Sequence, residues 1–136
     1  MNVIVRKYED KDYDSVNRIL LESFNLKKST ASSDCIELVA VSDDNVLGYL
    51  VLTKVYDCVK GKYYMLMDYV CVDSKYRRLG IGKKLVNYAL DYCEREGVMY
   101  LDLSSRTFRV EAHKLYEACG FIRRDSYIYR KEFLWL

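Results

Sequence analysis

The chain has 136 residues, of which 51% are hydrophobic and 31% are charged, and its formal net charge at pH 7 is +2. A chain of this length is expected to form a single domain over residues 1–136, with a core that needs neither disulfides nor a metal for support. The small net charge and the dispersed basic residues argue against a nucleic-acid partner.

No apolar run reaches the roughly 18 or more residues that a membrane helix needs, and the first residues are charged too early for a signal peptide. These observations predict a soluble cytoplasmic protein with no membrane partner. The five cysteines are odd in number and form no Cys-x-x-Cys pair, and the chain contains one histidine. We therefore expect neither a disulfide framework nor a metal site.

The first half of the chain predicts a strand, a helix and three antiparallel strands. Residues 2–8 are strand-like, and Asp10 is a suitable N-cap for a helix with apolar residues at helical spacing. A polar loop is expected over residues 25–34. The three strands that follow are predicted at 37–41, 46–56 and 63–72, and tight turns join them.

The second half alternates helices and strands. Apolar residues repeat with the period of a helix between 83 and 96, and Gly97 is expected to end that helix. A strand over 99–104 then implies a right-handed crossover and a parallel strand pair. Further on, the sequence predicts a helix over 109–119 and a closing hairpin made of 121–124 and 127–133.

The segment from Asp73 to Lys84 joins the third of these strands to the first crossover helix. The free N–H groups and the positive dipole end of a first helical turn attract an anion, and Gly80 and Gly82 let the backbone come close to it. We interpret this segment as a pyrophosphate-binding loop. The spacing excludes a P-loop, and it excludes the dinucleotide fingerprint because Leu85 stands where the third glycine belongs.

What remains is Arg-x-x-Gly-x-Gly, from Arg77 to Gly82, between a strand and a helix. This pattern resembles the acetyl-CoA signature of the GCN5-related N-acetyltransferases. A second segment, from Arg109 to Phe121, resembles the same family's later motif, an Ala-x-x-x-Tyr helix that closes on Gly-Phe. The two motifs stand in the family's order and at about its separation, with a predicted strand between them.

The resemblance implies an α/β (α+β) fold. Its sheet would be mixed and mostly antiparallel, with six to seven strands and about four helices, and it would be splayed between the fourth and fifth strands. The pantetheine arm of acetyl-CoA, the expected co-substrate, would lie in the splay, and no metal is implied.

The resemblance also assigns cofactor contacts. The backbone of Val70, Cys71 and Val72 would pair with the pantetheine and acetyl groups, although an ordinary core strand is the alternative. Arg109 stands where many relatives carry an asparagine that faces the cofactor, so that contact would be altered. The pyrophosphate would be bound by Arg77, Arg78, Leu79, Gly80, Ile81, Gly82 and Lys83. A tight turn without a ligand, flanked by solvated charges, is the alternative for this set.

Two residues are candidate catalysts. Acetyl transfer needs a deprotonated amine and a stabilised thiolate leaving group. Tyr116 matches the family tyrosine that donates a proton or hydrogen bond to the departing sulfur; the alternative is a packing role. Asp68 matches the position of a glutamate that acts as the base, usually through water; a structural hydrogen bond or an exposed position are the alternatives. His113 shares the helical face of Tyr116 and is a bystander or a base.

These assignments favour an N-acetyltransferase that moves an acetyl group from acetyl-CoA to a primary amine by direct attack in a ternary complex. The rival is a non-catalytic acyl-CoA-binding sensor or scaffold of the same fold. The sequence leaves the acceptor open among a polyamine, an amino acid, an antibiotic, a lysine side chain and a protein N-terminus. Homodimers are common in the family, but no residue locates an interface.

Overall fold

The computed structural model describes residues 1–30 and 33–134. The strands are β1 (Ile4–Lys7), β2 (Cys35–Ser42), β3 (Asn45–Asp57), β4 (Lys62–Val72) and β5 (Leu101–Asp102). The α-helices are α1 (Tyr13–Phe24), α2 (Ile81–Glu96) and α3 (Val110–Ala118), and two short 3₁₀ helices are η1 (Asp10–Asp12) and η2 (Ser74–Tyr76).

The five strands form one sheet in the order β1-β2-β3-β4-β5. Each of the first four strands pairs antiparallel with its neighbour, whereas β4 and β5 are parallel. Parallel neighbours need a crossover connection, and α2 provides it. The predicted mixed, mostly antiparallel α/β fold is therefore confirmed.

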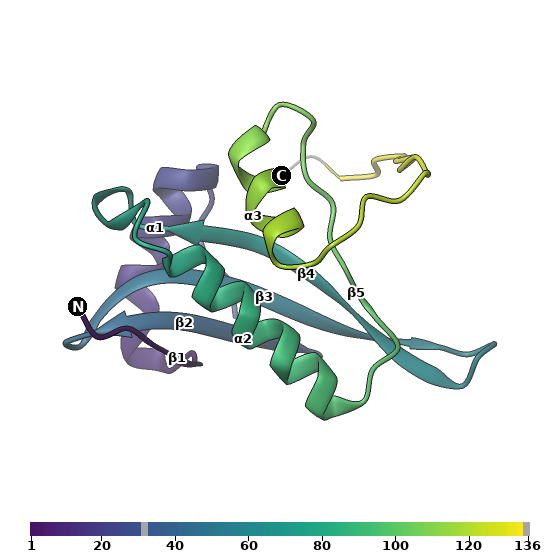
Figure 1. Cartoon of the computed structure of the whole chain (residues 1–136), viewed down its shortest axis with the longest axis horizontal. Helices are drawn as coiled ribbons and strands as arrows, with labels where there is room; N and C mark the ends of the chain where they lie inside the picture. Colours follow the sequence, from purple (N-terminus) through teal and green to yellow (C-terminus); the bar gives the residue numbers. More distant parts are fainter. Residues whose placement is uncertain (31–32, 135–136) are drawn as a thin grey trace.

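The sheet lies between α1 and α2, which cover opposite faces (Figure 1). Side chains of α2, such as Leu85 and Val86, pack with one set of strand residues that includes Leu50 and Leu52. On the other face, Val16 of α1 packs with a set from β2, β3 and β4. Because both faces of the sheet are buried, the central strands contain nearly continuous runs of apolar residues.

The parallel pair is short. Only Met65 with Leu101 and Leu66 with Asp102 lie in register, and β4 then runs on to Val72. Beyond Leu66, no strand within residues 1–30 and 33–134 pairs with this side of β4. The predicted splay between the fourth and fifth strands is thus present, and it leaves an open edge of backbone N–H and C=O groups on β4.

The predicted closing hairpin is wrong within the described chain, because no strand is formed between 121 and 134. This explains why the sheet has five strands instead of six or seven. Alternating apolar residues make a strand only beside a partner edge, and β5 offers just two residues. Four of the side chains that the hairpin would have buried are more than two-thirds exposed, namely those of Tyr127, Ile128, Tyr129 and Phe133.

Several boundaries also differ from the prediction. Asp10 begins η1, and Asp12 is the N-cap of α1, because the first turn is a 3₁₀ helix. The predicted fourth α-helix is not found among the described residues, which hold three α-helices and the two 3₁₀ turns. Gly97 ends α2 in the left-handed conformation, as predicted. None of these helices is long and apolar enough to span a membrane.

Candidate active site

The loop from β4 to α2 begins at a buried carboxylate, that of Asp73. It accepts a hydrogen bond from the Lys75 backbone N–H at 3.0 Å and one from Arg18 Nη1 at 2.7 Å. Burial would raise the pKa of Asp73, but these donors outweigh it and hold the pKa below its usual value. The start of the loop is therefore fixed to α1.

Glu22, near the end of α1, is a second anchor for the loop. Its carboxylate accepts hydrogen bonds from the Ser74 backbone N–H at 2.8 Å and from Ser74 Oγ at 2.7 Å. Arg77 Nη2 lies 3.8 Å from the same carboxylate. The pKa of Glu22 is lowered mainly by these Ser74 hydrogen bonds. The end of α1 and the loop are thus held together by polar contacts that no sequence pattern indicated.

The turn into α2 uses left-handed backbone at two positions. Gly80 has φ +79° and is the N-cap, and Arg78 has φ +65° although it carries a side chain. Strained residues of this kind cluster at functional sites. The first intrahelical hydrogen bond runs from Lys84 N–H to Gly80 O at 3.1 Å. The N–H groups at the start of the helix before Lys84 therefore have no helical acceptor and can bind an anion.

The two loop glycines are needed for different reasons. A Cβ added to Gly80 would meet nothing within 4 Å, so the space beside this residue is open. A Cβ on Gly82 would lie 3.2 Å from Leu115 Cδ2 and 3.8 Å from Val72 Cγ2. Gly82 therefore lets α3 and the end of β4 approach the first turn of α2. The two sequence motifs meet in space at this point, where Gly82 and Leu115 are in contact although they are 33 residues apart in the sequence.

The end of β4 turns alternate backbone groups toward the open edge. The carbonyl of Cys71 faces β3, because a Cβ on Gly48 would lie 3.0 Å from it. Backbone direction alternates along a strand, so Val70 and Val72 present their groups to the splay, where the Val72 carbonyl accepts a hydrogen bond from Arg77 Nε at 3.3 Å. The thiol of Cys71 is buried toward α1, and burial raises its pKa to about 12, which makes it a poor nucleophile.

A bulge interrupts β4 next to Asp68. Val51 pairs with Asp68 and Tyr49 pairs with Cys71, so a single residue of β3 faces two residues of β4. Tyr69 takes up the bulge with φ +56°, and its ring contacts that of Phe24 edge-on at 5.4 Å. The sequence prediction missed both the bulge and Phe24. A bulge re-aims side chains beside an active site, and here it leaves Asp68 and Tyr69 exposed.

Tyr116 lies at the convergence of α3 with β4. Its ring is half-buried and meets Phe121 edge-on at 5.9 Å. Burial raises the pKa of its phenol, the positive charge of Arg109 lowers it, and the negative charge of Asp68 raises it further. Such charge effects decline with distance, so the three side chains lie in one neighbourhood. With a raised pKa, the phenol keeps its proton at neutral pH and can donate it.

Asp68 accepts no hydrogen bond and forms no ion pair with any residue that the structure describes. The alternative of a structural hydrogen bond therefore has no partner in that part of the chain. Asp68 is exposed overall, but neighbouring residues desolvate its carboxyl group and raise its pKa, which makes it a stronger base than an ordinary aspartate. By contrast, His113 Nε2 lies 2.9 Å from the Arg106 carbonyl, which ties its ring to the preceding loop.

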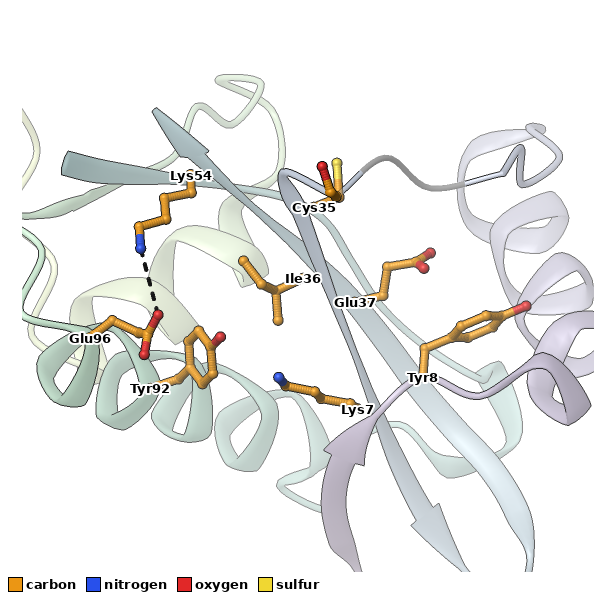
Figure 2. Close-up of a pocket in the computed structure, with 9 residues that line it drawn as sticks. Lys7, Tyr8, Cys35, Ile36, Glu37, Lys54, Tyr92 and Glu96 are labelled. Carbon is orange, nitrogen blue, oxygen red and sulfur yellow. Dashed lines mark ion pairs between the residues drawn. The ribbon is translucent and has the colours of Figure 1, made fainter. Parts of the chain in front are cut away.

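A hollow lies beside the last turns of α2 (Figure 2). It has a volume of about 430 Å³, and its walls include Lys7, Ile36, Tyr92 and the ion pair between Lys54 and Glu96, whose charged atoms are 3.7 Å apart. Tyr92 and Glu96 belong to the last turns of α2, whereas Gly80 caps its first turn. The hollow is therefore separate from the glycine loop. Within residues 1–30 and 33–134, no His, Cys, Asp and Glu cluster could hold a metal.

The structure is an α/β domain of the acetyltransferase type. Two features define it: an open mixed sheet with a helix on each face, and a glycine loop that begins the crossover helix beside a splayed parallel strand pair. The chain belongs to the acetyltransferase (GNAT) family, whose sequence model matches residues 4–121.

Known proteins agree with this assignment. The chain is 39% identical over 62 residues to the [ribosomal protein bS18]-alanine N-acetyltransferase of Escherichia coli (strain K12). The matched segment covers 43% of this chain and 42% of that protein. It is 36% identical over 73 residues to the uncharacterized N-acetyltransferase YhdJ of Bacillus subtilis (strain 168), covering 53% and 50%. The chain thus spans about half the length, or less, of these relatives.

Solved structures share the fold over almost the whole chain. A transcriptional regulator from Bacillus halodurans C-125 superposes with a TM-score of 0.84 at 19% identity, covering 97% of this chain and 100% of that one. A ribosomal-protein-alanine N-acetyltransferase from Brucella melitensis biovar Abortus 2308 gives 0.82 at 20% identity, covering 97% and 99%. At these identities the likeness concerns the fold alone.

Proposed function

We propose that this protein is an N-acetyltransferase that moves an acetyl group from acetyl-CoA to a primary amine by direct attack in a ternary complex. The observation that carries the proposal is the meeting of Gly82, Val72 and Leu115, which brings an anion-binding helix start, an open strand edge and the Tyr116 helix to one place. Family membership supports the same reaction.

The chain's features fit acetyl-CoA at this place. The open space beside Gly80 and the free N–H groups of the first α2 turn suit the pyrophosphate, with Arg77, Arg78 and Lys83 as flanking charges and Leu79 and Ile81 supplying backbone. The outward backbone groups of Val70 and the outward N–H of Val72 suit an extended arm that adds to the edge of β4, beside the Val72 carbonyl that Arg77 occupies. Acetyl-CoA would supply the acetyl group and the thiol that leaves.

In the proposed step the amine nitrogen attacks the acetyl carbonyl carbon, a C–N bond forms, and the C–S bond breaks. As the leaving sulfur gains negative charge, the phenol of Tyr116 donates its proton or a hydrogen bond to that sulfur. Asp68, through a water molecule, accepts the proton that the amine loses. Both groups have raised pKa values, which suit a phenol that stays protonated and a carboxylate that acts as a base.

A thioester-consumption assay over a mixed panel of primary amines tests the reaction. Release of CoA that depends on the amine is the expected result. The rival function, a sensor or scaffold that binds acyl-CoA without turnover, predicts affinity for acetyl-CoA and no CoA release with any amine.

Calorimetry tests the cofactor site separately. Gly80→Glu puts a carboxylate and a strained left-handed residue into the loop, so acetyl-CoA affinity should fall at least tenfold. Gly61→Glu is the matched control, because Gly61 has a similar φ of +68° in the turn between β3 and β4, away from the loop. Equal affinity in Gly80→Glu and the wild type would remove the pyrophosphate assignment.

The acceptor is an amine of a small molecule or of a protein, and the relatives include enzymes named for the alanine of a ribosomal protein. A cytoplasmic location is part of the proposal. It is supported by the odd number of cysteines in the sequence and by the lack of a Cys-x-x-Cys pair.

A further inference from the structure

The charge of Arg109 is uncompensated in the described structure. Its guanidinium has no carboxylate within ion-pair distance and no hydrogen-bond acceptor among residues 1–30 and 33–134. It lies instead on two aromatic rings, 5.1 Å from the centroid of Phe24 and 5.9 Å from that of Phe108. A guanidinium on ring faces keeps its N–H edge free for a planar anion.

The direction of α3 places Arg109 at the opposite end of this helix from the first turn of α2. At the far end of this helix, Leu115 touches the Gly82 position, and Lys83 lowers the pKa of Cys119 against the effect of burial. Arg109 is the N-cap, six residues before Leu115, which is about 9 Å along a helix axis. Arg109 therefore lies near the end of α1 and beside Tyr69 in the bulge of β4, at the opposite end of α3 from the first turn of α2.

The surroundings of Arg109 are apolar and open. Phe108 is 71% exposed, Val110 is 54% exposed, and Tyr69, whose ring meets Phe24, is 46% exposed. Together they offer apolar contact area beside a guanidinium that can bind a carboxylate with two parallel hydrogen bonds. Asp68 precedes Tyr69, so this surface borders the proposed base.

We propose that Arg109 determines acceptor specificity by binding a carboxylate carried on the amine substrate, while the rings of Phe24, Tyr69 and Phe108 contact the acceptor's apolar part. This inference rests on the proposed function and adds the acceptor's class to it: a primary amine with a nearby carboxylate. The two sources of that chemistry are a free amino acid and a peptide amino terminus followed by an acidic residue.

Matched acceptor pairs test the proposal. One pair is the tetrapeptide amides Ala-Asp-Ala-Ala and Ala-Asn-Ala-Ala, which share their amine and differ in one carboxylate. The other is alanine and alaninamide, compared with rates corrected for the neutral fraction of each amine. The wild type should favour the acidic member of at least one pair by about 10- to 100-fold in kcat/KM, the range of a charged hydrogen-bonded pair. The pair that shows the preference identifies the source.

Arg109→Gln should abolish this preference, and Arg109→Lys should keep part of it, since a single ammonium cannot bind both oxygens in plane. Arg106→Gln is the control, because it removes an exposed arginine three residues away and should leave the preference intact. Turnover of the neutral members and the KM for acetyl-CoA should stay within about twofold in Arg106→Gln, and the preference in each protein is taken as the ratio of kcat/KM between the two members of one pair.

Three outcomes would overturn the proposal: equal kcat/KM for both members in the wild type, an unchanged preference in Arg109→Gln, or a rise confined to the KM for acetyl-CoA, which would make Arg109 a cofactor contact. If CoA is released with none of the acceptors, the proposed reaction is wrong. Calorimetric titration of the same acceptor pairs into the CoA-loaded protein then tests the role of Arg109. Tighter binding of the acidic member that Arg109→Gln removes supports the inference, and equal binding overturns it.

Discussion

Residues 1–97 and residues 98–134 differ in how deeply their side chains are buried. Every fully buried hydrophobic residue in the described chain lies between Val16 and Cys93. α3 contains no buried residue, and the segment that follows it is largely exposed. The loop from β4 to α2 thus rests on the well-packed part, whereas Tyr116 and Arg109 belong to the thinly packed part.

The contrast has a consequence for function. Segments with few buried apolar contacts open with a lower free energy than the core, and a ligand that binds only the closed form stabilises them. Leu115 of α3 lies against Gly82 in the first turn of α2. We therefore expect the first part to determine stability and the second part to determine turnover and acceptor choice.

The largest expected effect is on the stability of the first part. Leu52→Ala removes a side chain with no exposed surface, so the free energy of unfolding should fall by about 2 to 5 kcal/mol. Leu115→Ala, at a half-buried position of α3, should cost about 1 kcal/mol. Urea denaturation measures both, and equal losses would contradict the division.

The next effect is on turnover. Tyr116→Phe keeps the ring and removes the proton donor, so kcat should fall by roughly 10², at the low end for general acids because a thiolate leaves fairly well without help. Acetyl-CoA affinity and the melting temperature should hardly change. Tyr100→Phe, another tyrosine of the second part, is the control. If Tyr116→Phe turns over within about threefold of the wild type while chemistry is rate-limiting, Tyr116 is a packing residue.

Acid should weaken the first part through Asp12. Burial would raise the pKa of this carboxyl, but hydrogen bonds from Arg6 and from the Glu9 backbone hold the pKa below its ordinary value. A lowered pKa gives stability that is present above about pH 4, the unfolded value, and is lost as the pH falls through the folded value.

Asp12→Asn should therefore lower stability at pH 7 by roughly 1.5 to 3 kcal/mol, the range for a hydrogen bond to a charged group. The difference from the wild type should shrink below pH 4. Thermal melts from pH 7 to pH 2 measure it, and a difference that stays constant over this range would show that the Asp12 charge contributes nothing.

The smallest effect concerns Asp68, where the two parts meet. Asp68→Asn should lower kcat/KM by about tenfold at pH 7, less than a general base usually contributes, because solvent reaches this exposed side chain and can take the proton instead. The loss should disappear toward pH 10, where the amine is already neutral. The pH profiles of kcat/KM for the wild type and Asp68→Asn test this role, and identical profiles would make Asp68 a bystander.

Local patterns determined much of this protein from the sequence. Helical and strand periodicity predicted α1, α2 and β2 to β4, and Gly97 marked the end of α2, because these signals depend on residues within one or two turns. The loop glycines and the Ala-x-x-x-Tyr helix were equally visible, because each needs a fixed local spacing. Family membership followed from the same two motifs.

Only the tertiary structure decided the remaining features. The bulge at Tyr69 exists because β3 and β4 have unequal numbers of residues between two paired positions, which neither strand shows alone. The segment 121–134 has the alternation of strands but forms none, because a strand needs a partner edge and β5 provides only two residues. Arg109 lies on Phe24 although 84 positions separate them, so its unpaired charge became visible only in the folded chain. Each of these depends on which distant segments meet, and that is determined by packing of the whole chain.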